Sequence, residues 1–172
     1  MKKMRYIYII SALMFFSSCN NYGISDQGFD LKELSGYVAF NADGTKAVLD
    51  PIDVAEDDGT ASFNIEIPTG SYSDVTVKFT FGGTAVFGTD FNVANSTSAG
   101  GEIIIKHAPT DFQDFDNVDL DIEILLDGVV DGDKTLVITL ESAIGADGTE
   151  FAVGRGGTDY LKSAEVNISD ID

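Results

Sequence analysis

The chain has 172 residues, of which ten are Lys or Arg and 29 are Asp or Glu, so its formal net charge at pH 7 is −19. A surface this acidic repels the phosphates of nucleic acids and anionic lipid headgroups, which argues against nucleic acid as a partner. The single cysteine cannot form an internal disulfide. The length is enough for one domain that buries a hydrophobic core without cross-links.

The first eighteen residues have the pattern of an export signal. Lys2, Lys3 and Arg5 precede an apolar stretch over 6–16, and two serines follow before Cys19. The apolar stretch is shorter than the roughly 20 residues that a membrane-spanning helix needs. Cleavage before the cysteine would leave seven basic residues against 29 acidic ones, a formal charge of −22.

The segment 13–19, Leu-Met-Phe-Phe-Ser-Ser-Cys, resembles the lipobox of bacterial lipoproteins, with Phe16 where leucine is usual. The resemblance implies that Cys19 is acylated after cleavage and anchors the protein at a membrane. The alternative interpretation is a plain secretory signal with an incidental cysteine. The expected location is the bacterial cell envelope, on the outer membrane, and the sequence leaves open whether the protein faces the surface or the periplasm.

Three parts are expected along the chain. Polar residues and glycines without apolar periodicity follow Cys19, which is typical of a flexible tether. Apolar periodicity begins after Gly36. The parts are therefore a lipoprotein signal peptide at 1–18, a lipidated cysteine with a tether at 19–35, and a folded domain at 36–172.

Apolar residues alternate with polar ones through 61–67, 75–81 and 118–124, as half-buried strands require. Shorter segments rich in β-branched and aromatic residues predict further strands at 37–40, 103–105, 136–140 and 164–168. Asp-Gly and Gly-Gly pairs separate the segments, and no stretch has the helical period with caps at both ends. We predict an all-β domain, an antiparallel two-sheet sandwich of seven or more strands, in which 60–67 and 74–81 form a hairpin.

Many acidic residues fall in loops at the predicted ends of strands. Glu56 precedes strand 60–67, and the return along 74–81 brings the chain back to the same end shortly before Asp90, so these two residues are expected to face each other. The remaining acidic positions lie in the connection before 134–140 and after the last strand: Asp127, Asp131, Asp133, Asp170 and Asp172.

Four blocks in order resemble the Calx-β domain family: VAEDDGT at 54–60, GTAVFGTDF at 83–91, the segment 122–136, and VNISDID at 166–172. The resemblance covers 36–172 and implies an immunoglobulin-like sandwich, which in calcium-binding members holds Ca²⁺ among loop carboxylates at one end. Carried over position by position, it implies the ligands Glu56, Asp90, Asp127, Asp131, Asp170 and Asp172.

The match to the family is incomplete at three positions. Leu126 replaces one of a pair of aspartates, Ile171 interrupts the terminal acidic triplet, and Lys134 stands where some members have a second Glu. Ca²⁺ takes about six to eight oxygen ligands, and converging carboxylates repel one another without a cation. Two interpretations stay open: a single weak calcium site, or ordinary turn-forming aspartates on an acidic surface.

The sequence predicts no enzyme. His107 is the single histidine and Cys19 is assigned to the lipid, so a Ser/His or Cys/His nucleophile would depend on His107, which follows an apolar run as a structural histidine often does. No pair of carboxylates marks a glycosidase.

The predicted function is a cell-envelope lipoprotein whose Calx-β-like module binds Ca²⁺ and mediates protein interaction or adhesion. The alternative is a glycan-binding accessory lipoprotein of a polysaccharide uptake system. Such binding relies on exposed aromatic rings. The chain has no Trp, and the aromatic candidates in or beside loops are Tyr72, Phe112, Phe115 and Tyr160.

Overall fold

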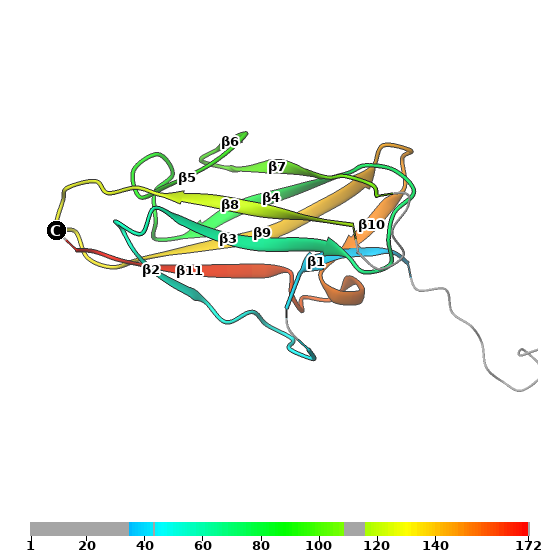
Figure 1. Ribbon diagram of the computed structural model, residues 1–172, viewed down its shortest axis with the longest axis horizontal. Coiled ribbons are helices and arrows are strands. Elements are labelled where there is room, and N and C mark those ends of the chain that lie inside the picture. Colours follow the sequence, from blue (N-terminus) through cyan, green and yellow to red (C-terminus); the bar gives the residue numbers. More distant parts are fainter. Residues whose placement is uncertain (1–34, 43, 109–115, 172) are drawn as a thin grey trace, which may run out of the picture. The chain divides into compact units, whose positions relative to one another are not determined.

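The computed structural model describes residues 35–42, 44–108 and 116–171. These residues form eleven strands and one short 3₁₀ helix (Figure 1). In chain order the elements are β1 (Tyr37–Phe40), β2 (Ile52–Ala55), β3 (Thr60–Ile67), β4 (Val75–Gly83), β5 (Phe91–Val93), β6 (Ser96–Thr97), β7 (Gly100–Ile105), β8 (Asp116–Ile124), β9 (Lys134–Gly145), β10 (Glu150–Val153), η2 (Arg155–Gly157) and β11 (Ser163–Ser169). No helix within these ranges is long and apolar enough to cross a bilayer.

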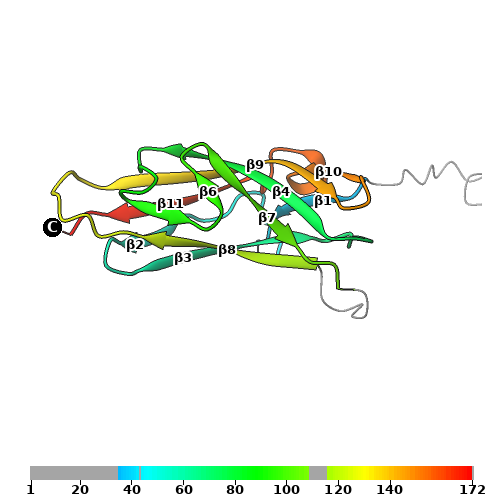
Figure 2. The ribbon, with the colours of Figure 1, turned by 90° about the horizontal axis from the view of Figure 1, so that it is seen from above.

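The strands form two layers that β1 connects (Figures 1 and 2). One layer has the order β5-β8-β3-β1, and the other has β10-β9-β4-β7-β6, with β11 and β2 continuing beside β9. β1 pairs antiparallel with β3 through Phe40 and Ile65, and parallel with β10 through Tyr37 and Ala152.

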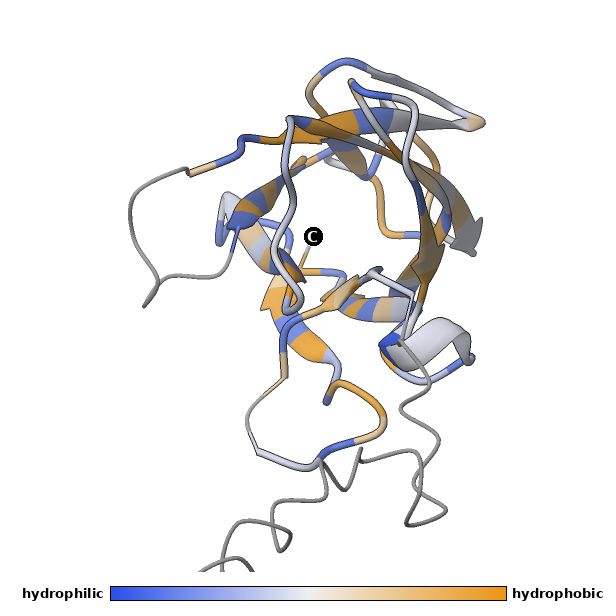
Figure 3. Ribbon diagram, turned by 90° about the vertical axis from the view of Figure 1, so that its right-hand side faces the viewer, coloured by the Kyte–Doolittle hydropathy of each residue, from blue (hydrophilic) through white to orange (hydrophobic). Residues whose placement is uncertain are grey.

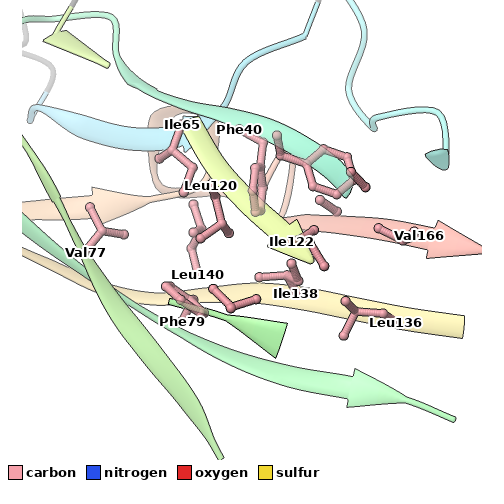
Figure 4. Close-up of a cluster of buried hydrophobic side chains, with 14 of the residues drawn as sticks. Phe40, Ile65, Val77, Phe79, Leu120, Ile122, Leu136, Ile138, Leu140 and Val166 are labelled. Carbon is pink, nitrogen blue, oxygen red and sulfur yellow. The ribbon is translucent and has the colours of Figure 1, made fainter. Parts of the chain in front are cut away.

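The core fills the space between the layers. Polar and apolar residues alternate along the strands, which gives the banded ribbons of Figure 3, because successive side chains of a strand point to opposite faces. Figure 4 shows Ile65 and Leu120 of one layer directed toward Leu140 of the other, and these three side chains are at most 1% exposed. Burial of each such side chain contributes about 1.5–3 kcal/mol.

The predicted all-β sandwich is confirmed, and each of the seven predicted strands is present. β9 is longer than predicted, because it continues through 141–145 as the partner of β4 and β10. Four further strands, β2, β5, β6 and β10, are four residues long or shorter, too short for a period of two to reveal them.

Two expectations about pairing are wrong. The segments 60–67 and 74–81 do not form a hairpin, because β3 pairs with β1 and β8 whereas β4 pairs with β7 and β9. The sandwich is not purely antiparallel either, because β1 pairs in parallel with β10 and β2 with β11. Period-two patterning specifies which face of a strand is buried, and any neighbour that covers that face satisfies it.

Candidate metal centre

One pole of the sandwich collects the ends of strands from both layers. β2 and β11 run parallel and end there, β8 ends there, and β9 begins there. In Figure 1 this is the end at which the yellow loop between β8 and β9 lies near the red end of β11. The loops that meet at this pole are those over 56–59, 84–90 and 125–133.

Three predicted ligands come together at this pole. Asp90, Asp127 and Asp131 each offer one carboxylate oxygen, and these oxygens lie within 4.8 Å of one another; we call these residues the aspartate trio. Ca²⁺–oxygen bonds are about 2.3–2.6 Å long, so two oxygens on opposite sides of one ion lie about 5 Å apart. The spacing of the trio therefore fits a single calcium ion.

Backbone hydrogen bonds position two members of the trio. Asp90 is 1% exposed; its Oδ2 accepts a hydrogen bond from the Val86 N–H at 2.5 Å, and its carbonyl accepts one from the Leu125 N–H at 2.9 Å. Oδ1 of Asp127 accepts a hydrogen bond from the Val129 N–H at 2.8 Å. The loops 84–90 and 125–133 are thus joined behind the carboxylates, although about 35 residues of chain separate them.

Asp170 lies beside the trio and supports it. Its Oδ2 accepts hydrogen bonds from the N–H groups of Asp131 at 2.8 Å and Gly132 at 2.6 Å. Its own N–H donates to Oδ1 of Asp133 at 3.2 Å. Asp170 therefore fixes the loop that carries Asp131.

Glu56, another predicted ligand, is not a member of the trio. Glu56 is 2% exposed in the turn between β2 and β3, where its N–H donates to the carbonyl of Ser169 at 3.2 Å. Glu56 lies at the same pole as the trio. Asp172 and Cys19 lie outside the described residues.

A lysine ammonium occupies the edge of the trio. Nζ of Lys134 lies 2.7 Å from Oδ1 of Asp131 and 3.0 Å from its carbonyl oxygen, and the side chain is 15% exposed. The hydrogen bond from Lys134 to Asp131 raises the pKa of the lysine, and the charges of Asp90 and Asp170 add to this effect. One positive charge is therefore built into the site.

The loop that carries Asp90 is fastened to the start of β9. The carbonyl of Thr135 accepts the N–H groups of Thr84 at 2.7 Å and Ala85 at 3.0 Å, and the Thr135 N–H donates to the Thr84 hydroxyl at 2.9 Å. Gly83 allows this approach: its φ is +94°, and a Cβ there would lie 2.1 Å from the Thr135 carbonyl oxygen. The Gly-Thr-Ala block of the sequence thus places Asp90 near Lys134.

A second polar cluster lies at the opposite pole, at the start of β8. The buried carboxylate of Asp116 accepts hydrogen bonds from the Ser71 N–H and hydroxyl at 2.8 and 2.6 Å and from the Ala108 N–H at 3.0 Å, and Nδ1 of His107 lies at 3.5 Å. Burial raises the pKa of Asp116, but these hydrogen bonds outweigh it and lower the pKa below the ordinary value.

The residue types of a serine triad meet in this second cluster, but in a different order. The hydroxyl of Ser71 and the ring of His107 both contact Oδ2 of Asp116. In a triad the imidazole lies between the hydroxyl and the carboxylate, where it can take the proton of the nucleophile. In this domain the carboxylate of Asp116 lies between the hydroxyl and the imidazole instead, and its hydrogen bonds hold Ser71 and Ala108 at the start of β8.

Comparison with known proteins bears on the fold. No protein-family model and no curated protein matches the chain. Among solved structures, the apo-form Calx CBD1 domain is similar, with a TM-score of 0.52 and 19% identity, over 80% of this chain and 99% of that one. The Calx CBD2 domain has a TM-score of 0.53 and 17% identity, over 78% and 86% of the two chains.

The fold is Calx-β-like. A third structure, CBD12 from CALX1.2, agrees, with a TM-score of 0.52 and 20% identity over 79% of this chain, which spans 44% of that one. The resemblance noted in the four sequence blocks is therefore confirmed at the level of the fold. At these identities the similarity shows the fold alone, and what binds at the acidic pole depends on the side chains that this chain places there.

Proposed function

We propose that the domain is a calcium-binding module in which the aspartate trio holds one Ca²⁺. The observation that carries this proposal is the convergence of three carboxylate oxygens within 4.8 Å, from loops that follow different strands. Oxygen-rich and flexible sites of this kind suit Ca²⁺, and water completes its coordination. Asp170 acts as a support of the loop rather than as a member of the trio.

A bound divalent cation supplies the positive charge that turns repulsion among the carboxylates into attraction. Asp90 belongs to the loop before β5, whereas Asp127 and Asp131 belong to the loop between β8 and β9. Each of these loops runs from one layer to the other, so closing the trio ties the two loops together and stiffens this pole. Lys134 supplies one of the positive charges that a second ion would bring, which favours a single ion.

We propose further that the protein is a non-enzymatic lipoprotein of the cell envelope, held at the outer membrane through Cys19. The lipobox-like segment supports the anchor. The order of Ser71, Asp116 and His107 supports a structural role for the one histidine. The calcium-stiffened pole would serve protein interaction or adhesion with a partner at the same membrane.

Glycan binding remains the second candidate because of one observation. Tyr72 is 96% exposed and lines a pocket of about 200 Å³ together with Phe151 and Asp147. An exposed ring beside polar groups can stack on a sugar. A glycan array on the purified protein and on Tyr72→Ala separates the two candidates, because loss of a specific signal in the variant would favour the glycan.

Thermal unfolding in chelator and in millimolar Ca²⁺ tests the calcium proposal. A ligand at about 100 times its Kd adds about 2.7 kcal/mol to stability, which raises the Tm of a domain of this size by about 5–10 °C. Asp127→Asn keeps the acceptor for the Val129 N–H and removes the charge, so it should lose most of the shift, whereas the exposed control Asp159→Asn should keep it. An unchanged melting curve in Ca²⁺ would sink the proposal.

A further inference from the structure

The two layers present open strand edges to each other on one side of the sandwich. β7 pairs with β4 on one side, and on the other β6 covers only Gly100 and Gly101. β8 pairs with β3 along its length, and on the other side β5 covers only 122–124. The outer edges of 102–105 and 116–121 therefore have no strand partner among the described residues. Open edges are templates for another strand.

A groove of about 520 Å³ lies between these edges, within the range of about 300–1,000 Å³ that binding sites occupy. In Figure 1 the short strands β5 and β6 lie at the left-hand ends of β8 and β7. Its floor is apolar and its rim is acidic: the floor includes Val93, Ile103 and Leu120, and the rim includes Glu102, Asp119 and Asp121. Among the described residues, no aromatic side chain lines it.

The rim keeps most of its negative charge. Asp119 and Asp121 accept hydrogen bonds of 2.8 Å from uncharged side chains of β3, so neither bond brings a cation to the rim. Glu102 lies opposite Lys78 in the ladder between β7 and β4, so one of the three carboxylates has a cation nearby. The groove therefore complements a positively charged occupant.

We propose that this groove binds an extended, basic segment of a partner protein, which adds as a strand to the open edge of β8. β8 offers the longer open edge, with six residues against four in β7. A strand has side chains on alternating faces. Apolar residues of the segment would contact Ile103 and Ile104, which are partly exposed residues of the lining, and the Lys or Arg residues between them would lie along the acidic rim.

The charge and the lining disfavour other occupants. A second copy of the chain carries a formal charge of −19 and is repelled. A sugar would find no aromatic ring on which to stack among the described residues of the lining. An added strand satisfies the backbone groups of the β8 edge, and main-chain pairing combined with alternating side-chain contacts is the mode of recognition by strand addition.

The test uses the purified protein and a heptapeptide of alternating Lys and Val whose termini are both capped. We expect saturable binding by calorimetry and slower hydrogen exchange of amides within 117–121, in chelator as well as in Ca²⁺, because no member of the aspartate trio lines the groove. A peptide of alternating Glu and Val, and one with the Lys and Val residues in separate blocks, should bind much more weakly. If the peptide with separate blocks of Lys and Val binds as tightly as the alternating peptide, charge attraction alone explains the binding and the proposal is overturned.

A charge-reversed variant locates the site. Asp119→Lys/Asp121→Lys should weaken binding of the Lys-Val peptide by about tenfold, because two favourable exposed charge contacts become repulsive. Glu150→Lys/Asp159→Lys makes the same change of net charge far from the groove and should change binding little. Equal weakening in both variants, or wild-type exchange that slows elsewhere but not in β8, would contradict the assignment. Melting curves verify that each variant is folded.

Discussion

Replacement of Lys134 by Gln should have opposite effects in the absence and in the presence of calcium. Nζ of Lys134 lies 2.7 Å from Oδ1 of Asp131, so the ammonium offsets the repulsion among the trio when no metal is bound. The same charge opposes a second cation at the same carboxylates. The variant should therefore be less stable than the wild type in chelator and bind Ca²⁺ more tightly.

The magnitude follows from the geometry. Unit charges 4 Å apart interact by about 1 kcal/mol in water, so loss of the ion pair and the remaining repulsion should lower the free energy of unfolding by about 1–2 kcal/mol in chelator. A calcium ion about 2.4 Å from a carboxylate oxygen lies about 4–5 Å from an ammonium that contacts the same carboxylate. The repulsion of about 1.5–2 kcal/mol that the variant removes corresponds to about 10–30-fold tighter binding.

Urea unfolding in chelator and calcium titration by calorimetry measure the two effects. Lys78→Gln, on an exposed position of β4, makes the same change of net charge away from the pole and should leave both quantities within error. Weaker calcium binding by Lys134→Gln would refute the reasoning, because the lysine would then support the metal instead of competing with it. An equal gain in Lys78→Gln would show a general charge effect.

Three further predictions concern the fold around the site. Asp116→Asn should lower the free energy of unfolding by about 1–3 kcal/mol at pH 7. Hydrogen bonds lower the pKa of Asp116 in the folded state, so the stability that its carboxylate contributes is present above the ordinary pKa of 3.8 and is lost as pH falls through the folded pKa. The free energies of unfolding of the two proteins, measured in urea, should therefore converge in acid. Gly83→Ala forces a Cβ against the Thr135 carbonyl at φ +94° and should cost about 1–3 kcal/mol and weaken calcium binding, which melting and titration would show. Leu140→Ala empties a fully buried site and should cost about 3–5 kcal/mol in urea unfolding with calcium affinity unchanged; a loss of affinity would mean that the core and the pole are coupled.

The strands and their buried faces could be predicted from the sequence because they depend on local order. Alternation in 61–67 and 118–124 places each side chain on one face or the other, whichever strand lies alongside. The position of acidic residues at strand ends was also predictable, since Asp127 follows the predicted strand 118–124 and Asp170 follows 164–168. The Gly-Thr-Ala block identified Asp90 through its likeness to a known family, although its physical basis, the approach of Gly83 to Thr135, is visible only in three dimensions.

Which strands pair, and how close their edges lie to one another, could be determined only from the tertiary structure. The partners of β3 and β4 are distant in sequence, and the apolar pattern of 60–67 and 74–81 is equally consistent with the hairpin that does not form. Which strand edges remain open, and hence the groove between β7 and β8, follows from those partners.

The metal site shows the same division at the scale of single side chains. The amino-acid sequence by itself determined that many carboxylates lie at the ends of strands in a β-sandwich, because turns rich in Asp and Gly must lie where strands end. The tertiary structure decided that Asp90, Asp127 and Asp131 converge, that Asp170 holds their loop, and that Lys134 joins them. The physical reason is that burial is specified residue by residue along the chain, whereas an approach of a few ångströms between loops depends on every turn and hydrogen bond that holds them.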